Sequence, residues 1–473
     1  MSRSGQIGVY TLLGLLALVL VVMLVLPFWF GMQAQARFAE AVDQLNRQGA
    51  PVLRLQTVRY DRGWLASRAE TLVHHSELPF TLKLTHDLRH GPVHLPGLLN
   101  DEPALLMAMV ESRLGPGETA GGPSLLIAQG RTRIALKGDV ASQWRLDEVM
   151  TAMLGSNQPV WMRADYSAAT GAATVQAQLP EANVQGPDGN DIRVSDLRLR
   201  LDARPGRHGR YLVGSYSVSL RYLRTGGIAD MASIEQLRLR ARASERGDRL
   251  DTELAVSFEQ ADTPAGRLGP ARLVVQLNNL DAQAVERYVD AQASLLEDID
   301  PMADPQALTA AVMPQLIEVV PQMLSQAELR VPALYLATAD GALSADATLT
   351  LPALDASFAA MPMAVLTALD LEARVAVDAP LLRGELERAL RTRLARARGA
   401  EFGEGGGLLR EEIDEDAAAQ SRSQLSVLAG QGYLSLVNDV YRTRITMREG
   451  SLLMNGKVLN PVALMPGAGA SRP

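Results

Sequence analysis

Alternation of apolar and charged residues with a period of two constrains the fold of this chain more than any other feature. In residues 237–243, Leu and Ala alternate with Arg238, Arg240 and Arg242, and residues 251–258 alternate in the same way. The cluster Glu245-Arg246-Gly247-Asp248 between the two runs is typical of a turn. Because successive side chains of a strand point to opposite faces, the pattern predicts an antiparallel hairpin with one buried and one wet face. We expect the outward arginines to pair with neighbouring carboxylates rather than to bind a ligand.

Further strands and several helices follow from the same kind of periodicity. Strands are predicted at 197–201, 216–222, 273–277, 331–336, 343–351, 369–377, 441–447 and 452–454, and helices at 281–297, 306–324, 381–398 and 416–438. Asp340-Gly341 and Asn455-Gly456 indicate tight hairpin turns, and Asp281 is a favourable N-cap. The expected fold class is α+β: one N-terminal transmembrane helix, then antiparallel β-meanders, which could form an elongated curved sheet, with interspersed helices.

An uncharged apolar run at residues 7–26 predicts the transmembrane helix. A helix of about 20 residues, at 1.5 Å per residue, covers about 30 Å, the thickness of the hydrocarbon core of a bilayer. Phe28, Trp29 and Phe30 suit the headgroup boundary, so residues 7–30 are expected to contact lipid. The run is longer than the apolar region of a signal peptide, which favours a retained anchor, although Ala34-Gln35-Ala36 has the small-x-small form that a signal peptidase accepts.

These patterns divide the chain into five parts. They are a cytoplasmic N-terminus and anchor at 1–32, a stalk helix at 33–48, a β-rich region at 49–280, a mixed helix and hairpin region at 281–460, and a disordered tail at 461–473. The body is expected in the periplasm, held by a single pass through a bacterial inner membrane. In the stalk helix, Phe38, Val42 and Leu45 form one stripe, and we favour its packing on the body over binding to the membrane surface. The Gly/Glu-rich segment 399–416 is left unassigned.

Composition excludes several classes of function. A formal net charge of −7 argues against nucleic-acid binding, which needs a concentrated basic surface. The absence of Cys excludes Cys-ligated zinc, iron–sulfur clusters and thiol catalysis. The sequence also lacks a Gly-x-Ser-x-Gly motif, a Walker lysine and a dinucleotide fingerprint. We therefore expect no enzyme activity and no cofactor.

Three short motifs carry a resemblance to a known family. They are Tyr60-Asp61-Arg62-Gly63, His90-Gly91-Pro92 and the closing hairpin that contains Gly450, Asn455 and Gly456. With the apolar N-terminal segment, their order and spacing resemble the YdgA family of bacterial inner-membrane-anchored proteins of unknown function over nearly the whole chain. The resemblance implies a periplasmic body on one N-terminal span and brings no catalytic residues. Structural roles are expected for the motif residues Tyr60, Arg62, Gly63, His90, Gly91, Pro92, Gly450, Asn455 and Gly456.

Three clusters of chemically capable residues also have simpler interpretations. His86, His90 and His94 have the spacing of metal ligands on a helix, but Gly91-Pro92 argues for a turn in which His90 bonds a backbone carbonyl. Arg62-Gly63 could contact an anion, but a hairpin turn with Gly63 at positive φ is favoured. The acidic run 411–416 lacks the ligand spacing of a calcium loop and is interpreted as a solvated loop or a helix start.

Three functions remain open from the sequence. The first is a periplasmic binding or structural protein of the cell envelope that holds lipid or another amphiphile in an apolar β-groove. The second is an envelope interaction scaffold or homodimer with no small ligand. The third and least favoured is an envelope hydrolase, because no pairing of a nucleophile with a base is visible.

Overall fold

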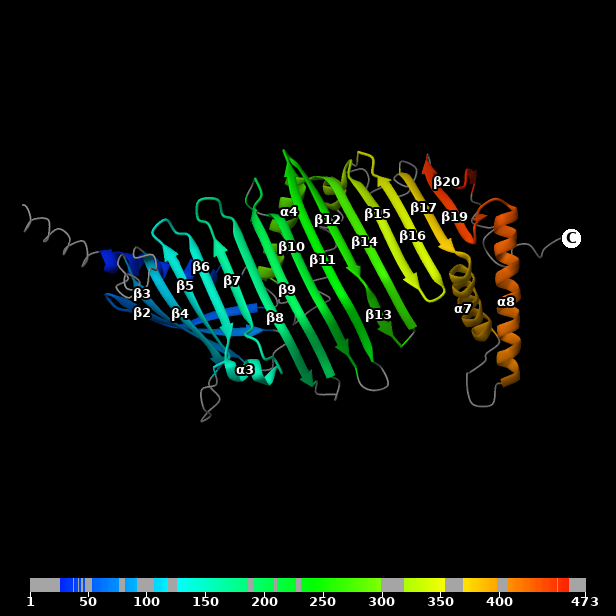
Figure 1. The fold of residues 1–473 in the computed structure, drawn as a ribbon. Coiled ribbons are helices and arrows are strands. Elements are labelled where there is room, and N and C mark those ends of the chain that lie inside the picture. Colours follow the sequence, from blue (N-terminus) through cyan, green and yellow to red (C-terminus); the bar gives the residue numbers. More distant parts are fainter. Residues whose placement is uncertain are drawn as a thin grey trace, which may run out of the picture. The chain divides into compact units, whose positions relative to one another are not determined.

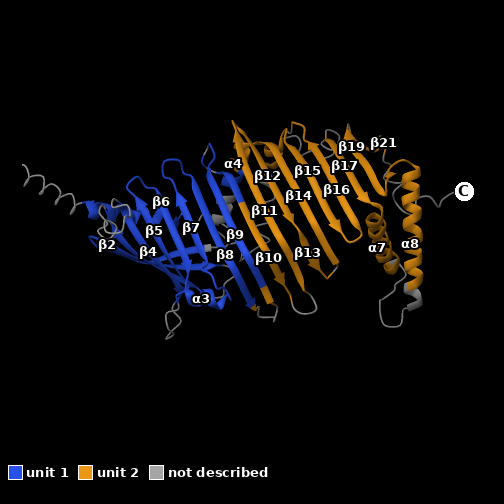
Figure 2. Cartoon of the chain, viewed as in Figure 1, with its two compact units in different colours: residues 1–184, 193–216, 288–315 blue, residues 185–192, 217–287, 316–473 orange. Residues whose placement is uncertain are grey.

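A computed structural model describes most of the chain. The described residues are 26–36, 38–40, 42–43, 46, 53–75, 81–91, 106–117, 126–185, 191–207, 209, 211–226, 231–264, 266–298, 319–353, 369–397, 407–448 and 450–458. Antiparallel strands dominate them (Figure 1). Contacts divide the chain into two compact units (Figure 2), one of residues 1–184, 193–216 and 288–315 and the other of residues 185–192, 217–287 and 316–473.

An antiparallel meander forms most of the first unit. Its strands are β1 (Leu53–Arg62), β2 (Ala66–His75), β3 (Leu82–His90), β4 (Leu106–Pro116), β5 (Ala128–Ala135), β6 (Val140–Leu146), β7 (Trp161–Tyr166) and β8 (Ala173–Gln185), and each pairs with the next. Helix α3 (Glu148–Met153) begins after Asp147, whose carboxylate accepts the Val149 N–H at 3.0 Å. Strands β9 (Asp191–Pro205) and β10 (Leu212–Thr225) come next, and residues 193–216 of this stretch belong to the unit.

A second series of antiparallel strands forms the other unit. These strands are β11 (Ala232–Arg246), β12 (Arg249–Phe258), β13 (Gln260–Thr263), β14 (Gly266–Asp281), β15 (Glu328–Thr338), β16 (Gly341–Thr350), β17 (Asp370–Asp378), β18 (Ser435–Val437), β19 (Val440–Arg448), β20 (Ser451–Met454) and β21 (Lys457–Val458). The pairing runs β11, β12, β14, β15, β16, β17, β19, β20, β21, with short β13 on β11 and β14 and short β18 on β19. Helices α7 (Ala379–Ala397) and α8 (Gly407–Gly430) also belong to this unit, whereas α4 (Ala282–Asp298) is divided, with residues 282–287 in this unit and the rest in the first.

The mostly antiparallel sheet with few helices confirms the predicted α+β meander. The hairpin predicted at 237–258 is β11–β12, in which Leu239 lies opposite Val256 and Arg242 opposite Glu253. Gly341 turns β15 into β16 with a φ of +136°, and Asn455 and Gly456 turn β20 into β21 with φ values of +47° and +77°. The predicted N-cap of α4 is also observed, since the Asp281 carboxylate accepts the Ala284 N–H at 2.9 Å.

The last predicted helix differs from the observed one at both ends. Helix α8 begins at Gly407 rather than near Asp416, so the acidic run 411–416 is helical. Ile413, in the middle of that run, is 1% exposed, and its burial explains why the helix extends through so many charges. The helix also ends at Gly430, because the residues up to Asn438 form the short strand β18 and a turn in which Asn438 has a φ of +50°.

Several predicted features fall outside the described residues. They include residues 7–25 of the predicted span, residues 306–318 of the predicted helix at 306–324, residues 399–406 and the tail at 461–473. Within the described ranges, no helix is both long and apolar enough to cross a membrane. The described residues between 26 and 46 are helical.

Candidate functional site

The N-terminal helix, here residues 26–46 where described, packs against the sheet at the start of the first unit. Phe30 and Ala34 are buried on its inner side, and Ala34 lies in one apolar cluster with Ala69 of β2 and Leu88 of β3. One turn further on, the Phe38 ring contacts the rings of Tyr60 and His86, with centroid distances of 5.8 and 5.3 Å. The spacing of 30, 34 and 38 is the helical repeat that places side chains on one face.

Small residues on the sheet allow this helix to approach closely. Ser67, Ala69 and Thr71 alternate along β2, and each is almost fully buried. On the helix, Gly31 lies so near His90 that an added Cβ would be 3.2 Å from its Nε2 atom. The sequence interpretation missed this helix-covered face. A signal was present in the alternation of these small residues with the charged Arg68 and Glu70.

Two histidines lie under the helix and are held by serines. The His90 Nε2 atom is 2.8 Å from the Ser67 hydroxyl, and the His86 Nδ1 atom is 2.8 Å from the Ser112 hydroxyl. Burial lowers the pKa of His90, and it lowers the pKa of His86 to about 4. Both imidazoles are therefore neutral at pH 7, and burial also raises the pKa of the neighbouring Tyr60 phenol.

The Ser67–His90 pair has the atoms of a nucleophile and its base but not the access that catalysis needs. Ser67 is 5% exposed and His90 is 7% exposed. The His90 ring touches Gly31 of the covering helix, so a substrate could not reach it without displacing the helix. We interpret the pair as part of the helix–sheet packing. This differs from the predicted bond between His90 and a backbone carbonyl. Strand β3 continues to His90, and the His90 side chain lies on the helix-covered face of the sheet beside Ser67 of β2.

Two of the sequence motifs meet at one end of this sheet. The Gly63 N–H donates to the Ala66 carbonyl at 2.9 Å, and the His90 N–H donates to the Leu65 carbonyl at 2.8 Å. The predicted positive φ of Gly63 is wrong. The position needs glycine because a Cβ would lie 2.5 Å from the Ala66 oxygen. At Gly91 a Cβ would lie 1.6 Å from the Leu106 oxygen, whereas Pro92 is outside the described residues.

Arg62 contacts an aromatic ring of the N-terminal helix. Its guanidinium carbon lies 5.3 Å from the centre of the Phe28 ring, and the Phe28 ring lies 5.4 Å from that of Trp64. The turn between β1 and β2 therefore joins the beginning of the N-terminal helix through a layer of aromatic and cationic side chains.

The closing motif lies in the second unit and serves its last hairpins. The Asn455 side chain donates to the Tyr433 carbonyl at 2.9 Å and accepts the Arg444 N–H at 2.8 Å. Gly450, with a φ of +73°, and Gly456 occupy turns on either side of β20. These contacts fix backbone geometry and offer no chemistry of their own.

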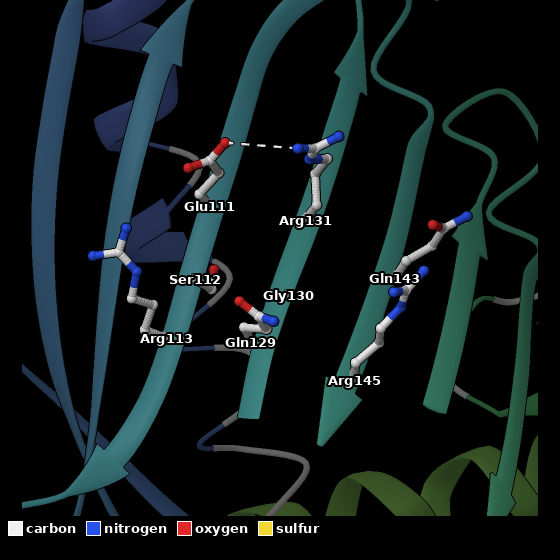
Figure 3. Close-up of a pocket in the computed structure, with 8 residues that line it drawn as sticks. All are labelled: Glu111, Ser112, Arg113, Gln129, Gly130, Arg131, Gln143 and Arg145. Carbon is white, nitrogen blue, oxygen red and sulfur yellow. Dashed lines mark ion pairs between the residues drawn. The ribbon is translucent and has the colours of Figure 1, made fainter. Parts of the chain in front are cut away.

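A shallow polar pocket lies on the other face of the first unit's sheet (Figure 3). Its volume is about 370 Å³, and it is lined by Glu111, Ser112, Arg113, Gln129, Gly130, Arg131, Gln143 and Arg145 of β4, β5 and β6. Arg131 lies 4.0 Å from Glu111, and Arg113 lies 3.7 Å from Asp87. Pairing of outward arginines with carboxylates is as predicted, and we interpret this surface as the wet face of the sheet. Within the described residues, no three His, Asp or Glu side chains are grouped as metal ligands.

The second unit has an apolar sheet face that is only half-buried. Leu and Val side chains line up across neighbouring strands, since Val256 lies opposite Leu273, Leu273 opposite Leu334, and Ala345 opposite Val375. The half-buried side chains of this face are Val256, Leu273, Val275, Leu334, Leu336, Leu343, Ala345, Val375 and Ile445. At the end of the face, Tyr441 is buried in a cluster with Ala379 of α7 and Leu425 of α8. Within the part of the chain that the structure describes, the other side chains of this face stay half-buried.

Comparison with known proteins gives one match. A family model described as a bacterial protein of unknown function (DUF945) matches residues 9–462. No curated protein matches, and no solved structure matches.

Proposed function

The chain belongs to the DUF945 family of bacterial proteins of unknown function, and on this premise we propose that it is a membrane-anchored periplasmic protein of the cell envelope that holds a lipid or another amphiphile on the apolar face of its second unit. The resemblance of its motifs to those of the YdgA proteins supports the inner membrane as its location. No nucleic acid, metal or cofactor enters this function.

The apolar N-terminal run and the helix next to it support the anchor. Residues 7–26 are uncharged and long enough to cross the hydrocarbon core as a helix. The chain is helical directly after them and packs on the sheet of the first unit through Ala34 and Phe38. A span at 7–26 would therefore lead into a helix that is held by the body.

The half-buried face of the second unit is the observation that carries the binding proposal. A sheet face that serves only as a core is normally buried. Leu273 and Val275, on either side of Val274, remain half-buried. Acyl chains would gain about 25 cal/mol per Å² of apolar surface removed from water on such a face. Burial of the same face against a second copy of the chain is the alternative, and it corresponds to the scaffold or homodimer function.

Site-specific photocrosslinking in intact cells would test the proposal. The full chain would carry benzoylphenylalanine either in place of Val375, on the apolar face, or in place of Ala376, which lies on the opposite face of the same strand. We expect a lipid adduct in the mass spectrum of the tryptic peptide at position 375 and none at position 376. A crosslinked dimer at 375 would support the scaffold instead, and the absence of any adduct at 375 would refute both uses of this face.

A further inference from the structure

Five large apolar side chains are exposed together at the beginning of the first unit. They are Phe28, Trp29 and Met32 of the N-terminal helix, which are 38%, 45% and 40% exposed, and Trp64 and Leu65 of the β1–β2 turn, which are 53% and 62% exposed. The two segments are joined, because the Phe28 and Trp64 rings lie 5.4 Å apart. We call these five residues the aromatic patch.

The way the N-terminal helix packs on the sheet determines which of its side chains are exposed. Pro27, Phe30, Gly31 and Ala34 are buried on its inner side, whereas Phe28, Trp29 and Met32 lie on the outer side of the same turns. An amphipathic helix on a water-soluble body would place polar residues there. The outer side becomes polar only further along, where Gln35 and Glu40 are exposed.

Backbone hydrogen bonds hold the turn half of the aromatic patch in place. Gly63 donates to the Ala66 carbonyl across the turn, and His90 of β3 donates to the Leu65 carbonyl. The turn is too tight for a side chain at Gly63, as shown by the 2.5 Å distance that a Cβ would have from the Ala66 oxygen. Trp64 and Leu65 are therefore presented to the outside by a fixed backbone.

The chemistry of the aromatic patch matches the headgroup region of a bilayer. Tryptophan is enriched there because its ring is apolar and its N–H can bond to water and headgroup oxygens. Arg62, whose guanidinium lies over the Phe28 ring at 5.3 Å, supplies a cation at the edge of the patch that can meet a lipid phosphate. The uncharged run 7–26 ends two residues before Phe28, which places any membrane that it crosses directly beside the patch.

We propose that the Trp64–Leu65 turn inserts into the headgroup region of the same bilayer that holds the anchor. The first unit then has two contacts with the membrane, the span and the turn, and cannot swing freely about the end of the span. This inference rests on the proposed membrane anchor and extends it to a part of the body that lies outside the anchor in the sequence.

Quenching of tryptophan fluorescence by brominated phospholipids would test the insertion. The full chain would be reconstituted into vesicles of phosphatidylethanolamine and phosphatidylglycerol, with bromine near the headgroup end of the acyl chains. The chain has four tryptophans, so Trp29, Trp64 or Trp144 can be retained alone while the others are changed to Phe. We expect bromination to lower the emission of Trp64 and of Trp29 to about half and to leave that of Trp144 almost unchanged, because only residues at the bilayer interface are near the bromine.

The possible results separate the two proposals. Quenching of Trp29 without quenching of Trp64 would refute the insertion of the turn and leave the anchor standing. Failure to quench Trp29 as well would refute the anchor and the insertion together. If a variant with a single tryptophan is unstable, Trp64→Phe in the otherwise native chain is a second test, and the fraction of quenchable emission must then fall. An unchanged fraction would also refute the insertion.

Discussion

At the residue scale, the two histidines under the N-terminal helix make stability depend on pH. The pKa of His86 is about 4 in the folded chain and 6.5 without burial, and burial lowers that of His90 in the same direction. Below pH 6.5 the unfolded state therefore binds protons that the folded state does not. For His86 alone, this difference in proton binding lowers the free energy of unfolding by about 1.4 kcal/mol for each unit by which the pH falls, down to about pH 4.

We accordingly expect the first unit to lose stability as the pH falls from 7 to 4.5, as measured by urea unfolding at each pH. The variant His86→Gln lacks the titrating group and should show a shallower decline, even if it is less stable at pH 7. Equal slopes for the native chain and this variant would contradict the assignment of the pH dependence to His86.

Glycine at position 91 is required by the close approach of β4. A Cβ there would lie 1.6 Å from the Leu106 carbonyl oxygen, so Gly91→Ala must displace the backbone. We expect a loss of about 3 kcal/mol in the free energy of unfolding. The matched control is Gly430→Ala, where nothing lies within 4 Å of the added Cβ and a change of about 1 kcal/mol or less is expected. Similar values for the two variants would contradict this account.

Gly63 shows which part of a residue's role can be predicted from the sequence and which part cannot. The turn at Arg62-Gly63 could be predicted, because Gly between two alternating runs is a turn signal. The reason for the glycine could not, since it depends on the Ala66 carbonyl, which only the folded turn brings to it. The contact between His90 and Ser67 was equally hidden, because it requires the register in which Leu88 of β3 lies opposite Ser67 of β2.

At the scale of elements, Phe38 holds the C-terminal part of the N-terminal helix against the sheet. Its ring contacts both Tyr60 and His86. Phe38→Ala should weaken the docking of the helix by about 3 kcal/mol and expose the sheet beneath it. Amides of β1, β2 and β3 should then exchange with deuterium faster, as measured by mass spectrometry. Gln35→Ala removes an exposed side chain from the same helix and should change little. Unchanged exchange in Phe38→Ala would show that this contact does not hold the helix.

Helices and strands could be predicted where a single periodic pattern of apolar residues runs along the whole element. The strands of the second unit follow the period of two closely, because one of their faces is apolar and the other is charged. The start of helix α8 was harder to predict, because its buried positions there include Ile413, Ala417 and Ser421, of which two are small. Spacing by four among small residues gives a weak apolar signal, although each of these side chains is at most 1% exposed.

At the scale of the whole molecule, periodicity says which segments are strands but not which of them pair. Strand β14, for example, pairs with β12, β13 and β15, and β19 pairs with β17, β18 and β20. The two units likewise exchange segments of the chain, with residues 185–192 in one and 193–216 in the other. Such a division arises from contacts between distant residues, which local patterns do not contain.

The proposed topology makes a prediction that uses the lack of cysteine in the native chain. Ser244, exposed on strand β11, and Ser4, before the predicted span, can each be changed to Cys as the single thiol. In spheroplasts, a membrane-impermeant maleimide should label Ser244→Cys at once, because an exported body faces the outside. Ser4→Cys should react only after the cells are lysed, since the short N-terminus stays in the cytoplasm when one helix crosses the membrane. The reverse pattern would place the body in the cytoplasm and refute the periplasmic location.

A second outcome would refute the retained anchor. In that outcome, the labelled Ser244→Cys protein is found free of the membrane. Only a chain released by cleavage after the span would be both exported and soluble.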